Sequence, residues 1–168
     1  MANIKEELKG LNDILHRVKL ETVMSKPVTT VEMNDDFSRV EEVFVNNSIR
    51  HLPVVNEKRE LVGIISQKDV YRHIAPRRNP EGQIVYRKDI IVDDDGYYEK
   101  DSLNQYILKH VMRKNVKVLT RERTLGDAIH LMVSERLSCV PIVDAKKHVI
   151  GIITRVDVLK LADSLYHD

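Results

Sequence analysis

The chain has 168 residues, of which 42% are hydrophobic and 32% charged, and this composition excludes a disordered or fibrous protein. Its 27 Lys and Arg residues nearly balance its 26 Asp and Glu residues, so the formal charge is +1. We expect no nucleic-acid binding, because contacts to phosphates need clustered cations. Cys139 is the only cysteine, which favours a reducing compartment. No signal peptide or membrane-spanning run is evident, so we expect a soluble cytoplasmic protein without membrane contact.

The chain begins with a predicted amphipathic helix over residues 3–20. Its apolar residues recur at helical spacing and form one stripe: Ile4, Leu8, Leu11, Leu15 and Val18. The stripe either packs against the chain's own core or forms a partner or dimer surface, and both interpretations are open at this point.

The next segment predicts the order strand, helix, strand, strand, helix. A short strand over residues 28–31 precedes a helix that Asp36 caps and whose apolar face consists of Phe37, Val40, Val43 and Phe44. Two β-rich runs and a short helix follow, over residues 52–56, over residues 61–66 and from about Gln67 onward.

Residues 76–105 depart from this pattern. Prolines and a glycine in residues 76–88 predict a mobile loop. In residues 89–100 an apolar triplet precedes Asp93-Asp94-Asp95-Gly96, which predicts a turn between short extended pieces. Residues 101–110 are predicted to be helical.

The same order of elements then returns. It consists of a strand over residues 116–119, a helix capped by Thr124, two strands over residues 140–144 and 149–154, and a short helix from Arg155. The apolar face of the capped helix consists of Leu125, Ala128, Leu131 and Met132.

These two segments are copies of one unit. Residues 49–70 (IRHLPVVNEKRELVGIISQKDV) align without a gap with residues 137–158 (LSCVPIVDAKKHVIGIITRVDV). Pro53, Gly63 and Asp69 fall on Pro141, Gly151 and Asp157, always 88 residues apart (141 − 53, 151 − 63, 157 − 69). The same offset carries Val23-Met24 onto Val111-Met112 and Lys26 onto Lys114. A unit this small cannot bury its apolar face alone, so we expect the two copies to share a core.

The repeated pattern resembles the CBS repeat, named after cystathionine β-synthase. Both copies carry Val-Met, then Leu-Pro-Val-Val or Val-Pro-Ile-Val, then Gly-Ile-Ile-Ser or Gly-Ile-Ile-Thr with an Asp three residues later. The resemblance covers roughly residues 20–75 and 106–165. We therefore expect an N-terminal helix (1–20), a first repeat (21–75), an inter-repeat insertion (76–105) that is longer than the usual linker, and a second repeat (106–168).

The resemblance implies an α/β (α+β) fold in which two β-α-β-β-α repeats, related by a pseudo-two-fold axis, pack into one disc. It implies a stand-alone Bateman-type module that is not an enzyme and binds an adenine nucleotide (AMP, ADP or ATP) in the cleft between the repeats. Such a module needs no cofactor, forms a homodimer, and signals to an unidentified protein by a change in conformation or dimer contact. A sensor of S-adenosylmethionine and a structural dimerisation module without ligand remain alternatives.

The sharpest candidate ligand-binding residues are Asp69 and Asp157, each at the start of a predicted helix. A carboxylate there accepts hydrogen bonds from vicinal hydroxyls, and the resemblance implies that it holds a ribose. The alternative is that each aspartate only stabilises a helix N-terminus. Ser66 and Thr154, three residues earlier, are N-caps, anion-binding hydroxyls or both.

The remaining candidates are residues that could reach a phosphate or the adenine: Lys68, Arg155, Arg50, His51, Ser138 and Thr30. The first copy is the more cationic, because Val156, Ser138 and Cys139 stand where it has Lys68, Arg50 and His51. We therefore expect phosphate-rich nucleotides to prefer the Asp69 site. The sequence contains no GxGxxG, GxxxxGK[ST], HExxH or paired CxxC motif, and no metal site or enzymatic activity is expected.

Overall fold

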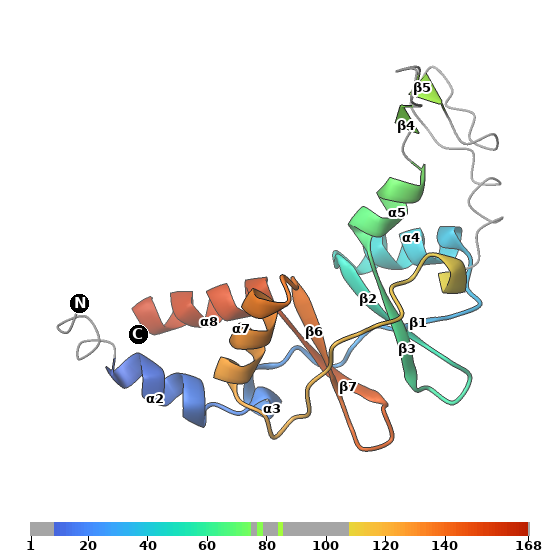
Figure 1. The fold of residues 1–168 in the computed structure, drawn as a ribbon. Helices are drawn as coiled ribbons and strands as arrows, with labels where there is room; N and C mark the ends of the chain where they lie inside the picture. Colours follow the sequence, from blue (N-terminus) through green and yellow to red (C-terminus); the bar gives the residue numbers. More distant parts are fainter. Residues whose placement is uncertain (1–8, 75–76, 79–83, 86–107, 168) are drawn as a thin grey trace. The chain divides into compact units, whose positions relative to one another are not determined.

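The computed structural model describes residues 9–74, 77–78, 84–85 and 108–167 (Figure 1). Contacts divide the chain into two compact units. Unit 1 comprises Met1–Val28, Arg59–Leu61 and Lys117–Asp168, and unit 2 comprises Thr29–Lys58 and Val62–Val116. Unit 2 contains most of the first repeat and unit 1 most of the second, whereas the segment that opens each repeat lies in the unit of the other.

The main part of unit 2 is a three-stranded sheet with two α-helices. Its elements are β1 (Val31–Glu32), α4 (Phe37–Asn47), β2 (His51–Val55), β3 (Leu61–Ser66) and α5 (Gln67–Ile74), with the strands in the order β1-β2-β3. β1 runs parallel to β2, with Val31 opposite Val54. The apolar face of α4 is buried in the core, as predicted, together with side chains from the sheet: Phe37, Val40, Val43, Phe44, Leu52, Val54 and Ile65. Asp36 caps α4 by accepting a hydrogen bond from the Arg39 amide at 2.9 Å, which confirms the predicted start of this helix.

Unit 1 is a two-stranded antiparallel sheet covered by helices. Its elements are α2 (Lys9–Arg17), α3 (Leu20–Val23), α7 (Leu125–Ser134), β6 (Cys139–Val143), β7 (Val149–Thr154) and α8 (Arg155–His167). Thr124 caps α7 in a capping box with Asp127, which confirms this prediction as well. α2 packs against α7, and Leu15 and Val18 contact the core of the unit. Leu15 and Val18 of the N-terminal stripe therefore pack against the chain's own core, whereas Leu11 is 46% exposed and Ile4 and Leu8 lie outside the described residues.

The duplication extends to the backbone conformation. Four non-glycine residues have a positive φ, and they form two pairs separated by 88 residues among the described residues. Ser48 and Arg136, which follow α4 and α7, have φ values of 52° and 54°. Arg59 and Lys147, in the two strand-to-strand turns, have φ values of 63° and 64°. Left-handed backbone at matched non-glycine positions shows that the two copies share one fold in detail.

The segment that opens each repeat packs in the unit of the other repeat. Ser25 exchanges two backbone hydrogen bonds with Ile152 of β7, at 2.8 and 3.1 Å. Arg113 exchanges two with Ile64 of β3, at 2.9 and 3.0 Å. The chain leaves one unit for the other after Val28 and again after Val116, which are also 88 residues apart.

The first strand of each repeat is shorter than predicted. The strand expected over residues 28–31 is β1 at Val31–Glu32, and the strand expected over residues 116–119 is one isolated parallel bridge between Leu119 and Ile142. Both predictions were wrong in extent, because pairing with the neighbouring strand begins only at the end of each predicted range, at Val31 and at Leu119.

Three further predictions need correction or fall outside the description. The loop expected over residues 76–88 contains a short antiparallel ladder between β4 (Arg77–Arg78) and β5 (Ile84–Val85), consistent with the strand preference of β-branched residues. The short helix expected from Arg155 continues for 13 residues. Of residues 101–110 only the end is described, as the 3₁₀ helix η1 (Leu108–His110), and the Asp93-Asp94-Asp95 turn lies outside the described residues.

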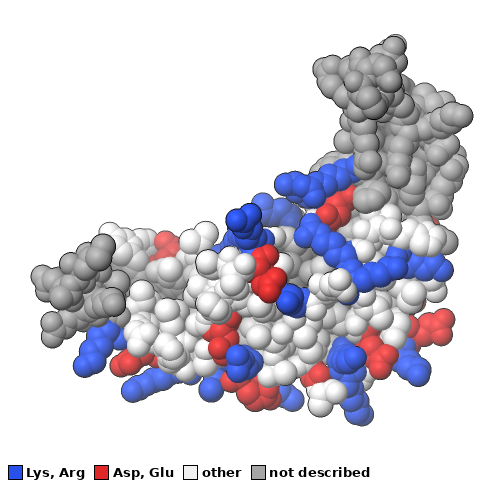
Figure 2. All heavy atoms as spheres, in the orientation of Figure 1, with Lys and Arg blue, Asp and Glu red and all other residues white. Residues whose placement is uncertain are grey.

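On the face drawn in Figure 2, acidic and basic side chains of the described residues intermingle, in keeping with the formal charge of +1. Within the described part of the chain, no helix is both long and apolar enough to cross a membrane.

Gly63 and Gly151 allow the exchanged segments to approach the sheets. A Cβ on Gly63 would lie 2.9 Å from Met112 Cγ and 3.2 Å from the Arg113 carbonyl oxygen. A Cβ on Gly151 would lie 2.8 Å from Met24 Cγ. A methyl group at either position therefore collides with a methionine of the segment that opens the other repeat.

We predict that Gly63→Ala lowers the free energy of unfolding by about 1–3 kcal/mol through overpacking. Gly10→Ala is the matched control, because a Cβ there meets nothing within 4 Å and alanine favours the helix α2. Thermal denaturation measures both variants. A melting temperature for Gly63→Ala equal to or above that of Gly10→Ala would contradict the packing described here.

Candidate functional site

Asp69 lies in the first turn of α5 and is only 7% exposed. Its Oδ2 accepts hydrogen bonds from the Ser66 amide at 3.0 Å and from Ser66 Oγ at 2.6 Å, while the Asp69 amide donates to Ser66 Oγ at 3.3 Å. Ser66 is thus an N-cap and a partner of the carboxylate at the same time. The backbone at the start of α5 fixes this carboxylate in place.

Arg113 reaches Asp69 from the segment that opens the second repeat. Its Nη2 donates to Asp69 Oδ1 at 2.8 Å and to Oδ2 at 3.0 Å. The arginine side chain is 56% exposed, whereas that of Asp69 is 10% exposed. Burial by itself raises the pKa of Asp69, but the hydrogen bonds from Arg113 and Ser66 together outweigh it and hold the pKa below the ordinary aspartate value. Asp69 is therefore ionised at neutral pH.

His51 and Arg50 lie beside this pair. The Arg50 carbonyl accepts a hydrogen bond from the Gln67 amide at 3.1 Å, which joins the start of β2 to the start of α5. Burial lowers the pKa of His51, and the charges of Arg50 and Arg113 lower it further, against the opposing effect of Asp69. Because the ordinary histidine pKa is about 6.5, His51 is mostly neutral at pH 7.

The structure therefore brings four of the predicted first-copy residues together at the start of α5: Ser66, Asp69, Arg50 and His51. The fifth, Lys68, is exposed within the first turn of this helix, and Thr30 lies half-buried directly before β1. The roles of these six residues in ligand binding stay a prediction.

Asp157 repeats the arrangement at the start of α8. Its Oδ2 accepts hydrogen bonds from the Thr154 amide and from Thr154 Oγ1, both at 2.7 Å. Its Oδ1 accepts one from Ser25 Oγ at 3.1 Å. Ser25 precedes Arg113 by 88 residues, so equivalent positions of the two copies contact the two carboxylates, once with a neutral hydroxyl and once with a guanidinium.

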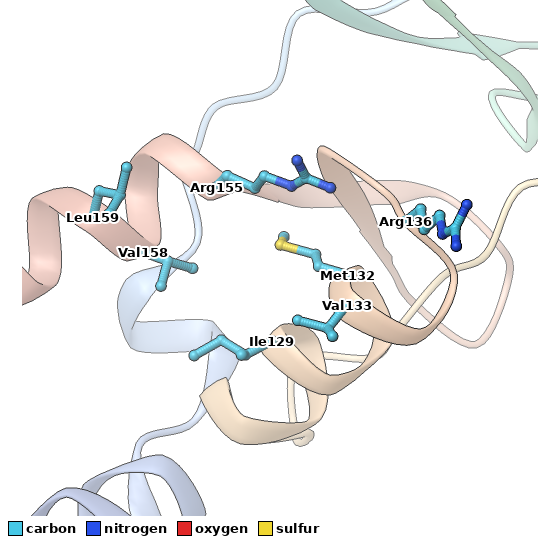
Figure 3. A pocket seen from close by; sticks show the side chains of 7 residues that line it. All are labelled: Ile129, Met132, Val133, Arg136, Arg155, Val158 and Leu159. Carbon is cyan, nitrogen blue, oxygen red and sulfur yellow. The ribbon is translucent and has the colours of Figure 1, made fainter.

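The other two predicted residues of the second copy lie at the same helix start. Ser138 is exposed, and its carbonyl accepts a hydrogen bond from the Arg155 amide at 3.1 Å, as Arg50 does for Gln67. The Arg155 side chain donates from Nε to the Leu137 carbonyl at 2.8 Å. This contact holds Arg155 beside the apolar pocket shown in Figure 3.

That pocket lies between α7 and α8 and has a volume of about 500 Å³. Its wall is mostly aliphatic, with two arginines at its edge: Ile129, Met132, Val133, Val158, Leu159, Arg136 and Arg155 (Figure 3). Because nearly all of its lining is apolar, it suits an apolar side chain and not a ribose or a phosphate.

Sequence reasoning missed Arg113 and Ser25. Both lie within the ungapped repeat, directly after the Val-Met pairs at residues 23–24 and 111–112. A signal was therefore present at matched positions, but sequence alone does not say that each repeat lends its opening segment to the other. Among the described residues, no group of three or more His, Cys, Asp or Glu side chains is arranged to hold a metal ion.

Comparison with known proteins identifies the repeat. The family model described as CBS domain matches residues 20–76 and 108–164. The uncharacterized protein MJ1426 of Methanocaldococcus jannaschii is 30% identical over 151 residues, which are 84% of this chain and 89% of that protein. Homoserine O-acetyltransferase of Methanosphaera stadtmanae is 26% identical over 90% of this chain, but the match spans 25% of the enzyme's length.

Solved structures have the same fold. The CBS domain pair of protein MJ0100, in complex with 5′-methylthioadenosine and S-adenosyl-L-methionine, has a TM-score of 0.67 at 22% identity, over 88% of this chain and 98% of that one. CBSX2 in complex with AMP has a TM-score of 0.66 at 21% identity, over 89% and 98%. Two matched repeats that together cover more than half of the sequence, in a fold shared with solved CBS pairs, show that the chain belongs to the CBS domain family.

Proposed function

We propose that this protein is a non-enzymatic regulatory module that binds an adenine nucleotide (AMP, ADP or ATP), with the carboxylates of Asp69 and Asp157 as its ribose acceptors. The observation that carries the proposal is the pair of helix-start carboxylates, each held by the hydroxyl and the amide of the residue three positions earlier. Ligand binding regulates another protein, by a change in conformation or in the contact between two copies of the chain. The single cysteine supports a reducing compartment, and we propose the cytoplasm.

Carboxylates fixed in this way suit a ribose. Vicinal 2′- and 3′-hydroxyls donate two hydrogen bonds that a single carboxylate accepts, and such charge-assisted bonds are the stronger kind. Because the backbone already holds Oδ2 in place, little side-chain entropy is lost when a ligand binds. The adenosine compounds bound to MJ0100 and CBSX2 support this ligand class.

Phosphate groups find their partners at the first site. Arg50 and Lys68 are exposed beside the start of α5, and His51 offers a neutral imidazole. At the second site Ser138, Cys139 and Val156 occupy the corresponding positions, and the Arg155 side chain contacts Leu137. S-adenosylmethionine is the second candidate ligand, because a ribose carboxylate does not distinguish the groups attached to the 5′ carbon.

The apolar pocket between α7 and α8 supports a homodimer. α8 exposes Leu159, Leu165 and Tyr166, which are 67%, 53% and 83% exposed. A two-fold interface is self-complementary, so the same surface of both copies takes part in it. In each copy α8 would line the pocket and would also supply an apolar side chain to the pocket of the other copy. We propose that Leu165 or Tyr166 of a second copy occupies this pocket.

Asp69→Asn and Asp157→Asn each are predicted to weaken the binding of AMP by tenfold or more at the altered site, because about 1.5–3 kcal/mol is typical for a hydrogen bond to a charged group. Asparagine keeps an acceptor for the cap. Asp127→Asn is the matched control, since Asp127 pairs with Thr124 at the start of α7 in the same way. Asp127→Asn is expected to lower the stability of the protein without changing its affinity for AMP. Isothermal titration calorimetry with AMP, ADP, ATP and S-adenosylmethionine measures all three variants.

Two results would contradict this proposal. One is equal affinity in wild type, Asp69→Asn and Asp157→Asn. The other is that none of the four compounds binds the wild-type protein at millimolar concentration, which would leave a structural dimerisation module without ligand.

For the dimer we predict that Leu159→Glu halves the molar mass measured by analytical ultracentrifugation, since it places a charge in the apolar contact. Val118→Glu is the control, because Val118 is 39% exposed and lies outside α7 and α8. A monomeric wild type, or a Leu159→Glu variant that remains dimeric, would show that this face does not join two copies.

A further inference from the structure

The two carboxylates differ most in the side chain that covers them. Arg113 covers Asp69 with two charge-assisted hydrogen bonds, at 2.8 and 3.0 Å. Ser25 covers Asp157 with one neutral hydroxyl at 3.1 Å. The two residues are equivalent in the repeat (113 − 25 = 88), so this difference is the result of a single position.

A ribose that binds Asp69 competes with Arg113 for the same oxygen atoms. The Ser66 amide and hydroxyl both donate to Oδ2 of Asp69. Arg113 donates from Nη2 to both oxygens and is the residue that contacts Oδ1 in these bonds. A bound ribose therefore replaces an ionic partner. At Asp157 a ribose replaces only the weaker contact from the Ser25 hydroxyl.

The displaced guanidinium needs a new anionic partner. Arg113 is 56% exposed, and its backbone is held to Ile64 of β3 by two hydrogen bonds, so its side chain can turn while its Cα stays in place. Its charge lowers the pKa of His51, as the charge of Arg50 also does. An anionic group bound beside His51 would therefore be attracted by the charges of both Arg50 and Arg113.

We propose that Arg113 determines the ligand selectivity of the Asp69 site: it pairs with Asp69 in the free protein and with the ligand's phosphate in the complex. A nucleoside without phosphate opens the ion pair and leaves the guanidinium without an anion, so it binds weakly. A phosphorylated nucleoside offers a phosphate in exchange for the carboxylate. The Asp157 site, with Ser25 in the same position, does not discriminate in this way and accepts adenosine compounds without a phosphate.

This inference rests on the proposed function, because it assumes that an adenosine compound binds at Asp69. It goes further in assigning the choice between phosphorylated and unphosphorylated ligands to residue 113. It also assigns the Asp157 site to the uncharged or thioether class of adenosine compounds.

The test is an exchange of the two equivalent side chains, with each site measured alone. In the Asp157→Asn background only the Asp69 site is intact, and in the Asp69→Asn background only the Asp157 site. Calorimetric titration with AMP and with adenosine then gives the ratio of the two dissociation constants for each site. We expect Arg113→Ser to reduce the preference for AMP over adenosine at the Asp69 site by about tenfold, the typical effect of a lost charge-assisted bond. We expect Ser25→Arg to create such a preference at the Asp157 site.

Arg113→Gln is titrated in parallel, because it retains most of the side-chain length and removes only the charge. It is expected to lose the preference as Arg113→Ser does. An unchanged ratio in Arg113→Ser and Arg113→Gln, with AMP still bound, overturns this inference and leaves the proposed function intact. Failure of both AMP and adenosine to bind the wild-type protein overturns the proposed function, and this inference with it.

Discussion

The pairing of each repeat's opening segment with the other repeat's second long strand determines the geometry of both candidate sites. The backbone bonds of Arg113 to Ile64 bring the Arg113 side chain to Asp69, and those of Ser25 to Ile152 bring Ser25 to Asp157. Gly63 and Gly151 permit this approach by leaving room for Met112 and Met24. Each site therefore combines residues that lie far apart in the sequence, which only a folded chain brings together.

The duplicated unit has diverged in charge while its backbone has stayed the same. Matched φ values at Ser48 and Arg136, and the matched bonds of Ser66 to Asp69 and Thr154 to Asp157, show that both carboxylates occupy equivalent places. Around Asp69 the partner is a guanidinium. Hydrogen bonds from Arg113 and Ser66 keep the pKa of Asp69 low in spite of burial, whereas burial and the charges of Arg50 and Arg113 lower the pKa of His51. A single fold thereby presents one carboxylate paired with a guanidinium and one paired with a neutral hydroxyl.

Local signals in the sequence predicted much of the fold. The 88-residue offset, the caps Asp36 and Thr124, and the apolar faces of α4 and α7 all depend on neighbours within a few residues or on the repeat itself. The strands expected at residues 28–31 and 116–119 were wrong in extent, because the residues with which a strand pairs lie far away in the sequence. Arg113 was missed for the same reason. Its contact with Asp69 spans 44 residues of sequence, and no periodicity or motif encodes such a contact.

The central claim, that both helix-start carboxylates accept the ligand, can be tested on the amides that donate to them. The Ser66 and Thr154 amides bond to Oδ2 of Asp69 and Asp157, at 3.0 and 2.7 Å, and the Thr124 amide bonds to Asp127 at 2.9 Å as an internal reference. In a titration of the ¹⁵N-labelled protein with AMP, the account predicts saturable amide shifts at Ser66 and Thr154 and none at Thr124. Binding of AMP that leaves Ser66 and Thr154 as unaffected as Thr124 would contradict it.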